Sequence, residues 1–211
     1  MRINKKQITY NRTPRTQKPV YIVIHDTGNT GKGANANAHF NYFNGGNRNA
    51  SADFFVDDTQ ILQVNDYNKF YTWHCGDGKG KYGITNRNSI GIEICVNSDS
   101  NYDVAFCKTV ELTKYLMKEL NIDIDHVVRH YDASRKNCPA SMNKNGWALW
   151  NTFKASLVVQ TELRSVNDIV WELAHRGIVS DKELWLKKLE KDNNSYWLAR
   201  KTVKYLSDNG V

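Results

Sequence analysis

The sequence predicts an α/β fold in which helices flank a mixed central β-sheet, followed by a small all-α C-terminal module. Apolar runs of strand length alternate with segments of helical periodicity up to about residue 157, which is typical of one mixed α/β domain. From residue 161 onward there is helical periodicity but no strand pattern. The length of 211 residues accommodates one full domain and a small appendage. We therefore expect a first domain over residues 1–157 and a helical module over residues 161–211.

Four segments predict the strands of the sheet. Residues 20–25 (VYIVIH) form a continuous and mostly β-branched run, as in a strand covered on both faces. Residues 54–64 (FFVDDTQILQV) hold two apolar runs around an Asp-rich turn, which predicts a hairpin. Residues 89–96 (SIGIEICV) show isoleucine at every second position, and residues 125–130 (DHVVRH) form a further short strand.

Helices are predicted between these strands and throughout the C-terminal module. Alanines and aromatic residues recur at helical spacing in residues 33–43, and the glycine pair that follows ends this helix. Residues 105–120 carry an apolar stripe that stops at Asn121, and residues 144–157 are helical again. We expect the intervening residues 131–143 to form a loop. The module contains three amphipathic segments, at residues 166–175, 182–191 and 196–207.

Charge is concentrated at the N-terminus. The chain has 29 Lys+Arg and 22 Asp+Glu, a net charge of +7, and six of the basic residues but no acidic residue lie in residues 1–18. We expect this segment to be a solvated basic arm, and attraction to a polyanionic surface is the alternative. Residues 161–211 resemble a helix-turn-helix only superficially, because nine basic and eight acidic side chains leave no basic face for DNA. Nucleic acid is therefore not an expected partner.

The distribution of apolar residues indicates where in the cell the protein is expected. No apolar run approaches the roughly 18 residues of a membrane span, so we expect none. The basic start is not followed by an apolar segment or a small-residue cleavage pattern, so we expect no secretory signal. The expected location is the cytoplasm of the producing cell.

Two histidines stand at the ends of predicted strands. His25 ends the first strand and His130 ends the last. If these strands are neighbours, both side chains meet at one edge of the sheet, and Cys138 on the following loop can fold back to the same point. Two imidazoles and one thiolate suit Zn²⁺ and leave a fourth position open. The alternative is that each residue is separately structural, since no HExxH or CxxC motif accompanies them.

Two charged residues could complete an active site. Glu93 points opposite to its neighbouring isoleucines on an apolar strand, where a carboxylate needs a partner or a catalytic task such as general base. Lys136, two residues before Cys138, could place a cation beside a developing oxyanion, although a solvated loop lysine is the alternative. The other three cysteines are expected to be packed thiols, because four cysteines are too few for a disulfide scaffold in a chain able to build its own core: Cys75, Cys95 and Cys107.

Four motifs occur together in one order: VIHDTGN, WHCGDG, NSIGIEIC and RHYDASRKNCP. In this combination they resemble the type 2 family of N-acetylmuramoyl-L-alanine amidases, which includes many phage endolysins and shares its fold with peptidoglycan recognition proteins. The resemblance covers roughly residues 18–157.

The resemblance implies a site and a reaction. His25, His130 and Cys138 would bind Zn²⁺, and Glu93 and Lys136 would be catalytic. The implied reaction is zinc-dependent hydrolysis of the amide bond between the lactyl group of N-acetylmuramic acid and L-alanine in bacterial peptidoglycan. The role that we expect is that of an endolysin, which lyses the cell wall after release through a holin-type pore; the expected lack of a signal peptide favours this role over that of a host autolysin, which is the alternative. The alternative is a non-catalytic peptidoglycan-binding protein of the same fold, which should lack the zinc cysteine.

The resemblance also extends to the substrate groove and the C-terminal module. Trp73 and His74 match a WH pair that lines the groove in this family. At Ala52 and Asp53 the sequence departs from the family pattern, in which many members carry a tyrosine, so no substrate-facing tyrosine is expected there. The C-terminal module is similar to short helical modules of some clostridial-type endolysins, which implies attachment to the cell wall. Self-association through its helices is the other possibility.

Overall fold

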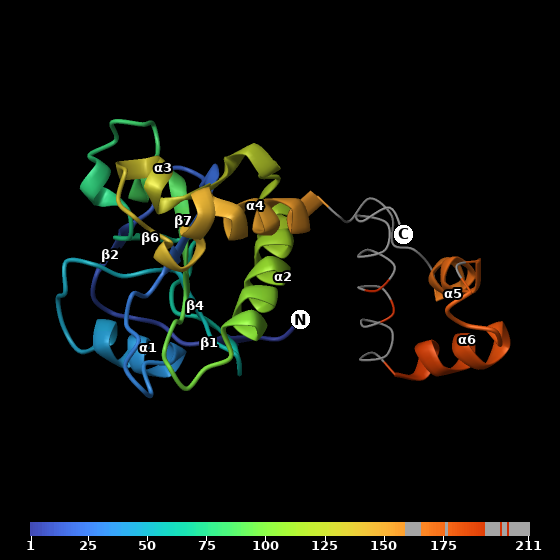
Figure 1. The fold of residues 1–211 in the computed structure, drawn as a ribbon. Coiled ribbons are helices and arrows are strands. Elements are labelled where there is room, and N and C mark those ends of the chain that lie inside the picture. The colour runs from blue at the N-terminus through green and yellow to red at the C-terminus, as the bar shows by residue number, and fades with distance from the viewer. Residues whose placement is uncertain (159–165, 176, 193–198, 200–201, 203–211) are drawn as a thin grey trace. The chain divides into compact units, whose positions relative to one another are not determined.

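A six-stranded mixed sheet with helices on both faces organises the first part of the chain (Figure 1). The computed structural model describes residues 1–158, 166–175, 177–192, 199 and 202. The chain divides into two compact units, Met1–Val159 and Gln160–Val211, and each is described by itself. The α/β class predicted from the sequence is confirmed.

The sheet brings the carboxyl ends of its central strands to one edge. β3 pairs in parallel with both β7 and β8, and β7 pairs in parallel with β4. β4 and β5 form the predicted antiparallel hairpin. Since parallel strands end at the same edge, residues that follow β3, β7 and β8 can meet there. The strand order is β1 (Ile3–Lys5), β5 (Ile61–Gln63), β4 (Phe54–Val56), β7 (Ser89–Ile94), β3 (Tyr21–Asp26) and β8 (Val127–Arg129).

Helices cover the two faces of the sheet unequally. α2 (Tyr102–Leu120) and α4 (Lys144–Val158) lie over one face, and α1 (Ala36–Asn44) lies over the other (Figure 1). α2 ends at Asn121, whose left-handed backbone (φ 53°) confirms the predicted stop. The boundaries of α1 are set by Asn35, whose side chain accepts a hydrogen bond from the Ala38 amide, and by the glycines that follow.

Strand alternation decides which residues reach the functional edge. Every second residue of β3 and β7 is a fully buried isoleucine packed in the larger core, together with α2 and α4. The intervening residues therefore face the opposite side of the sheet. His25 and Glu93 are among these residues, and they lie opposite each other in register. The isoleucines of the larger core are Ile22, Ile24, Ile90, Ile92 and Ile94.

The N-terminal segment differs from the prediction of a solvated arm. β1 pairs in parallel with β5, and β2 (Arg12–Pro14) pairs antiparallel with β6 (Phe70–Thr72) in a second, two-stranded sheet. Ile8 between them is fully buried. The prediction was wrong because each of these strands has only three residues, one of them charged (Lys5 in β1, Arg12 in β2), and so shows no apolar run, although their backbones still pair.

Residues 131–143 also differ from the predicted loop. α3 (His130–Ser134) follows β8 directly, and a short 3-10 helix, η4 (Ala140–Met142), comes after it. α3 ends at Arg135 in a left-handed conformation (φ 69°), which turns the chain back toward the sheet. Because α3 has only five residues, it is too short to produce a periodic pattern in the sequence.

The second unit is helical where it is described. α5 (Val166–His175) and α6 (Lys182–Lys191) coincide with two of the predicted amphipathic segments and share a small apolar core. The third segment, at residues 196–207, lies outside the described residues apart from 199 and 202.

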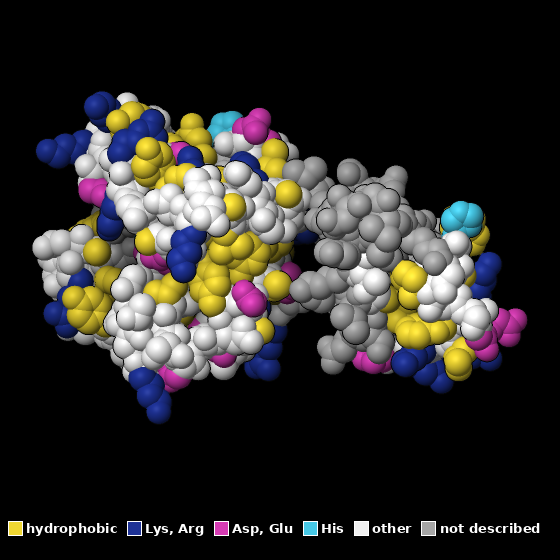
Figure 2. Space-filling view, in the orientation of Figure 1, with side chains coloured by type: hydrophobic (Ala, Val, Ile, Leu, Met, Phe, Trp, Pro, Cys, Tyr) yellow, Lys and Arg dark blue, Asp and Glu magenta, His cyan; other side chains and the backbone are white. Residues whose placement is uncertain are grey.

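Lys and Arg side chains stand at separate places over the face of the molecule seen in Figure 2, and do not form one basic surface there. Among the helices described, none is both long and apolar enough to cross a membrane.

The buried carboxylate of Asp53 links several strands through hydrogen bonds. Asp53 is fully buried and accepts hydrogen bonds from Asn65 Nδ2 (2.7 Å), Thr72 Oγ1 (2.8 Å) and the Gly91 amide (2.9 Å). Burial raises the pKa of Asp53, and these donors oppose the rise. Asp53 therefore joins β6 and β7 to the segments that flank the β4–β5 hairpin, which gives a structural reason for the acid at this position.

Replacing Asp53 should destabilise the fold. Asp53→Ala leaves three donors without their acceptor, so we expect the free energy of unfolding to fall by about 3–5 kcal/mol in urea denaturation. Asp125→Ala, at an exposed carboxylate, is the control and should change it by less than about 0.5 kcal/mol. A loss below about 1 kcal/mol for Asp53→Ala would contradict the assigned role.

Candidate metal centre

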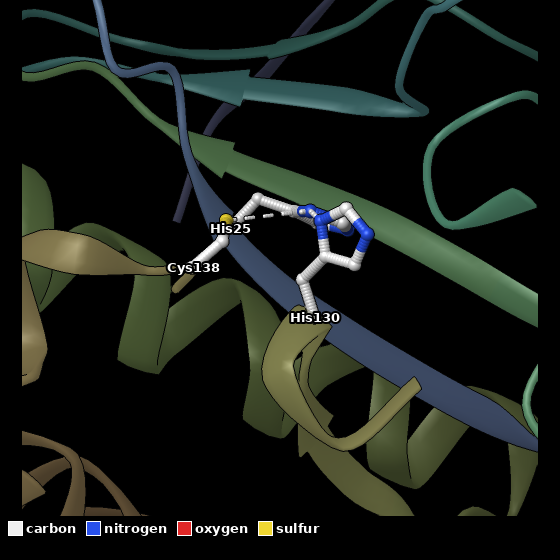
Figure 3. A group of neighbouring side chains, drawn as sticks. All are labelled: His25, His130 and Cys138. Carbon is white, nitrogen blue, oxygen red and sulfur yellow. Dashed lines mark hydrogen bonds between the residues drawn. The ribbon is translucent and has the colours of Figure 1, made fainter. Parts of the chain in front are cut away.

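The side chains of His25, His130 and Cys138 converge at the carboxyl edge of the sheet (Figure 3). His25 comes from the end of β3, His130 begins α3 directly after β8, and Cys138 lies on the following loop. The two Nδ1 atoms are 3.1 Å apart, and Cys138 Sγ lies 3.8 Å from His25 Nδ1. All three residues are buried, and their ligand atoms lie within 4.8 Å of one another. The prediction that the two strands are neighbours is confirmed.

The two distances that involve His25 Nδ1 are close to those expected around a tetrahedral metal ion. With Zn–N of about 2.05 Å and Zn–S of about 2.3 Å, two nitrogens lie about 3.3 Å apart and a nitrogen and sulfur about 3.6 Å apart. The observed 3.1 Å and 3.8 Å are close to these values. Burial lowers the pKa of His25 well below its usual value, so its ring is neutral as a metal ligand requires. Burial raises the pKa of Cys138, so a nearby cation is needed to hold it as a thiolate.

Asp77 orients the second histidine. Its Oδ1 lies 2.7 Å from His130 Nε2. Partial burial opposes ionisation, but the bond from His130 lowers the pKa of Asp77, so the group is a carboxylate and only accepts hydrogen bonds. His130 Nε2 therefore carries the proton, and Nδ1 of the neutral ring presents its lone pair to the cluster. This carboxylate–histidine arrangement is common beside metal ions.

The backbone brings Asp77 to this position. Asp77 lies in the short 3-10 helix η1 (Gly76–Gly78), which packs closely on α3. A Cβ atom at Gly78 would collide with the carbonyl oxygen of Ala133, so this approach requires glycine. Sequence reasoning missed Asp77, although it stands inside the WHCGDG motif. The available signal was an acid flanked by two glycines, immediately after a histidine and a cysteine.

Glu93 lies beside the cluster with an unused oxygen. Its Oε1 is 3.9 Å from His25 Nδ1, and Oε2 is buried without a hydrogen-bond partner among the described residues. The pKa of Glu93 is raised to about 8, chiefly by burial and also by the neighbouring Asp26, while Lys136 opposes the rise. A carboxylate whose pKa lies near neutrality can both accept and return a proton.

Lys136 is exposed on the loop that carries Cys138. Its positive charge opposes the rise in the pKa of both Glu93 and Cys138, so it acts electrostatically across the cluster. This loop is anchored at its far end, because the Ser141 amide donates to Asp26 Oδ2 at 2.7 Å. Asp26, which follows His25 in the sequence, is a second residue that sequence reasoning did not single out.

The two residues expected in the substrate groove differ in their surroundings. Trp73 is partly exposed, and its Nε1–H donates to Thr13 Oγ1 at 3.0 Å. His74 is only 8% exposed. Its Nδ1 lies 3.0 Å from His25 Nε2, and its Nε2 lies 3.1 Å from Ser89 Oγ. Both ring nitrogens of His74 therefore have partners inside the protein. The expectation that Trp73 and His74 line a substrate groove stays a prediction.

The remaining cysteines do not join the metal-ligand group. Cys75 and Cys95 are buried and Cys107 is partly buried. No disulfide links the four cysteines, all of which lie in the described part of the chain.

Comparisons with known proteins agree with this site. A family model described as N-acetylmuramoyl-L-alanine amidase matches residues 15–141, a span that includes all three candidate ligands. N-acetylmuramoyl-L-alanine amidase XlyA of Bacillus subtilis (strain 168) is 41% identical over 147 residues, covering 70% of this chain and 47% of the relative. CwlH of the same strain is 40% identical over 143 residues, covering 68% of this chain and 54% of the relative. The chain thus spans about half the length of these relatives.

Solved structures show the same similarity in three dimensions. A mutant endolysin from Bacillus subtilis superimposes with a TM-score of 0.67 at 40% identity, covering 74% of this chain and 98% of that chain. The catalytic domain of XlyA gives a TM-score of 0.66 at 39% identity, covering 74% of this chain and 99% of that chain.

Removing Asp77 should weaken metal binding without removing a ligand. For Asp77→Ala we expect a loss of roughly 10–100-fold in zinc affinity, because His130 is then free to rotate and to change tautomer. Competition with a chromophoric chelator measures this. Ser134→Ala is the matched control, since it removes two 3.3 Å hydrogen bonds, one to Asp77 Oδ2 and one from the Lys136 amide, and leaves the His130 contact in place. Equal zinc affinity for Asp77→Ala and wild type would contradict the orienting role.

Proposed function

Because this chain belongs to the N-acetylmuramoyl-L-alanine amidase family, we propose that it hydrolyses the amide bond between N-acetylmuramic acid and L-alanine in bacterial peptidoglycan. We propose zinc as the metal, held by His25, His130 and Cys138. One observation carries the proposal: a buried set of two imidazoles and a thiol stands beside a buried carboxylate oxygen that has no partner among the described residues. A protein that only bound peptidoglycan would have no use for this combination.

The surrounding residues have distinct proposed tasks. A bound zinc ion supplies Lewis-acid polarisation and lowers the pKa of water. Glu93 Oε2 takes the proton of the attacking water and returns it to the leaving nitrogen, for which its raised pKa is suited. The Lys136 ammonium stabilises the negative charge that develops on the carbonyl oxygen. Asp77 keeps His130 oriented throughout.

We further propose that the protein acts as an endolysin. In this role it is made in the cytoplasm and reaches the wall through a holin-type pore, and both points stay predictions. The similarity to a solved structure described as a mutant endolysin from Bacillus subtilis supports the role.

The C-terminal unit is proposed to attach the enzyme to the cell wall. Tethering to an insoluble substrate raises the local concentration of enzyme. Trp171, Ile178 and Leu184 are exposed on the described part of this unit and are available for such contacts. Self-association is the competing prediction. Deleting residues 161–211 distinguishes them: wall attachment predicts reduced pelleting with purified walls, whereas self-association predicts a reduced oligomer mass.

Two substitutions should separate metal binding from proton transfer. Cys138→Ser should lose both zinc and activity, because a ligand is removed. Glu93→Gln should retain zinc and lower kcat by roughly 10²–10⁴-fold, because the amide cannot accept the proton. Metal analysis and the rate of release of amino groups measure the two effects. Cys107→Ser, on α2, is the control and should keep zinc and rate.

Product analysis then tests the proposed bond. Digested peptidoglycan should yield new free amino groups that belong to L-alanine, without new reducing sugar, and a chelator should abolish the release until zinc is restored. A zinc-replete and fully active Glu93→Gln protein would remove Glu93 from the mechanism. Binding to walls with no product of either kind would favour the non-catalytic alternative.

A further inference from the structure

His74 connects the candidate ligand His25, through Ser89, to the backbone of Thr85 in the loop before β7. Its Nδ1 lies 3.0 Å from His25 Nε2, and its Nε2 lies 3.1 Å from Ser89 Oγ. The Ser89 hydroxyl in turn donates to the carbonyl oxygen of Thr85. We propose that this hydrogen-bond chain, from Thr85 through Ser89 and His74, fixes the tautomer of His25 so that its Nδ1 is ready for the metal. His74 is then a positioning residue, and the inference deepens the proposed function because it rests on His25 being a ligand.

The direction of each hydrogen bond follows from the carbonyl oxygen of Thr85, at which this series of hydrogen bonds ends. A backbone carbonyl only accepts, so the one hydroxyl proton of Ser89 points at Thr85. Ser89 Oγ can then only accept from its other neighbours, and His74 Nε2 must donate to it. In the neutral His74 ring Nδ1 is consequently an acceptor. It receives the proton of His25 Nε2, which leaves His25 Nδ1 unprotonated.

The hydrogen-bonding capacity of Ser89 is fully used in this arrangement. Cys75 Sγ lies 3.8 Å from Ser89 Oγ, and since the hydroxyl proton is committed to Thr85, the thiol is the donor. Ser89 therefore donates one bond and accepts two, which is its full capacity. Ser89 is fully buried, so no solvent competes for these positions.

The two outer hydrogen bonds together prepare the metal site. Asp77 fixes the proton of His130 on Nε2, and the chain through His74 fixes the proton of His25 on Nε2. The two Nδ1 atoms then face each other at 3.1 Å with a lone pair each and no proton between them. Such a pair is repulsive until a cation lies between the nitrogens. The protein therefore holds both rings in the metal-binding tautomer before the metal arrives.

Gly91 holds the His74 ring at the required place. A Cβ atom built on Gly91 would lie 2.6 Å from His74 Cγ and 2.9 Å from His74 Nδ1. The imidazole thus rests directly on the backbone of β7, which explains a glycine between the isoleucines of the IGIE sequence. A side chain at residue 91 would displace the ring without removing any polar group.

The test compares variants of the full chain that change only the acceptor for His25. His74→Leu removes the acceptor and keeps an apolar volume, whereas His74→Asn can return an acceptor oxygen near the position of Nδ1. Gly91→Ala displaces the ring. Ile84→Val is the matched control, because Ile84 is buried in the cluster that also contains Cys75 but makes no polar contact. Thermal unfolding confirms that each variant folds, zinc affinity is measured by chelator competition, and ¹⁵N shifts report the His25 tautomer in zinc-free protein.

We expect His74→Leu and Gly91→Ala to lower zinc affinity by roughly 10–100-fold and to mix the His25 tautomers. His74→Asn should recover most of the affinity, and Ile84→Val should match the wild type. Unchanged affinity and an unchanged tautomer in His74→Leu would overturn the inference. If the wild type itself binds no zinc, the proposed metal function fails, but the tautomers of the zinc-free wild type and His74→Leu still decide whether His74 positions His25.

Discussion

The parallel pairing of β3 with β7 and β8 is the constraint on which the site depends. It places the end of each strand at one edge, so that His25, Glu93 and His130 meet although they are far apart in sequence. Alternation along β3 and β7 turns isoleucines into the core under α2 and α4 and leaves His25 and Glu93 on the other face. The apolar residues that stabilise the sheet thus also fix the direction of the side chains in the candidate site.

Burial shifts the pKa values of the side chains in and beside the cluster. Removal from water keeps His25 neutral, raises the pKa of Cys138 and raises the pKa of Glu93 to about 8. Each change disfavours charge in the absence of a cation, and a bound metal ion together with Lys136 would supply the positive charge that the interior lacks. Asp77 accepts a hydrogen bond from His130, and in our proposal His74 accepts one from His25, so that both imidazoles are oriented from outside the cluster. The site is prepared by its surroundings, as is common for metal centres whose outer contacts set the direction of the ligands.

The sequence predicts those parts of the molecule that local patterns determine. Apolar runs predict β3, β7 and the β4–β5 hairpin, and residues at strand ends predict the convergence of His25, His130 and Cys138. Strands β1, β2 and β6 escape prediction because each has only three residues, too few to show a periodic pattern. Asp77, and the contact of His74 with His25, escape it for another reason. These contacts with His130 and His25 join residues 53 and 49 positions apart, through a loop whose path depends on close packing at glycine.

X-ray absorption at the zinc edge of the purified protein tests the central claim most directly, because it reports the atoms bound to the metal independently of activity. The account predicts two imidazole nitrogens at about 2.0–2.1 Å and one sulfur at about 2.3 Å, with the sulfur contribution lost in Cys138→Ser. A wild-type spectrum without sulfur, or one unchanged by Cys138→Ser, would contradict it.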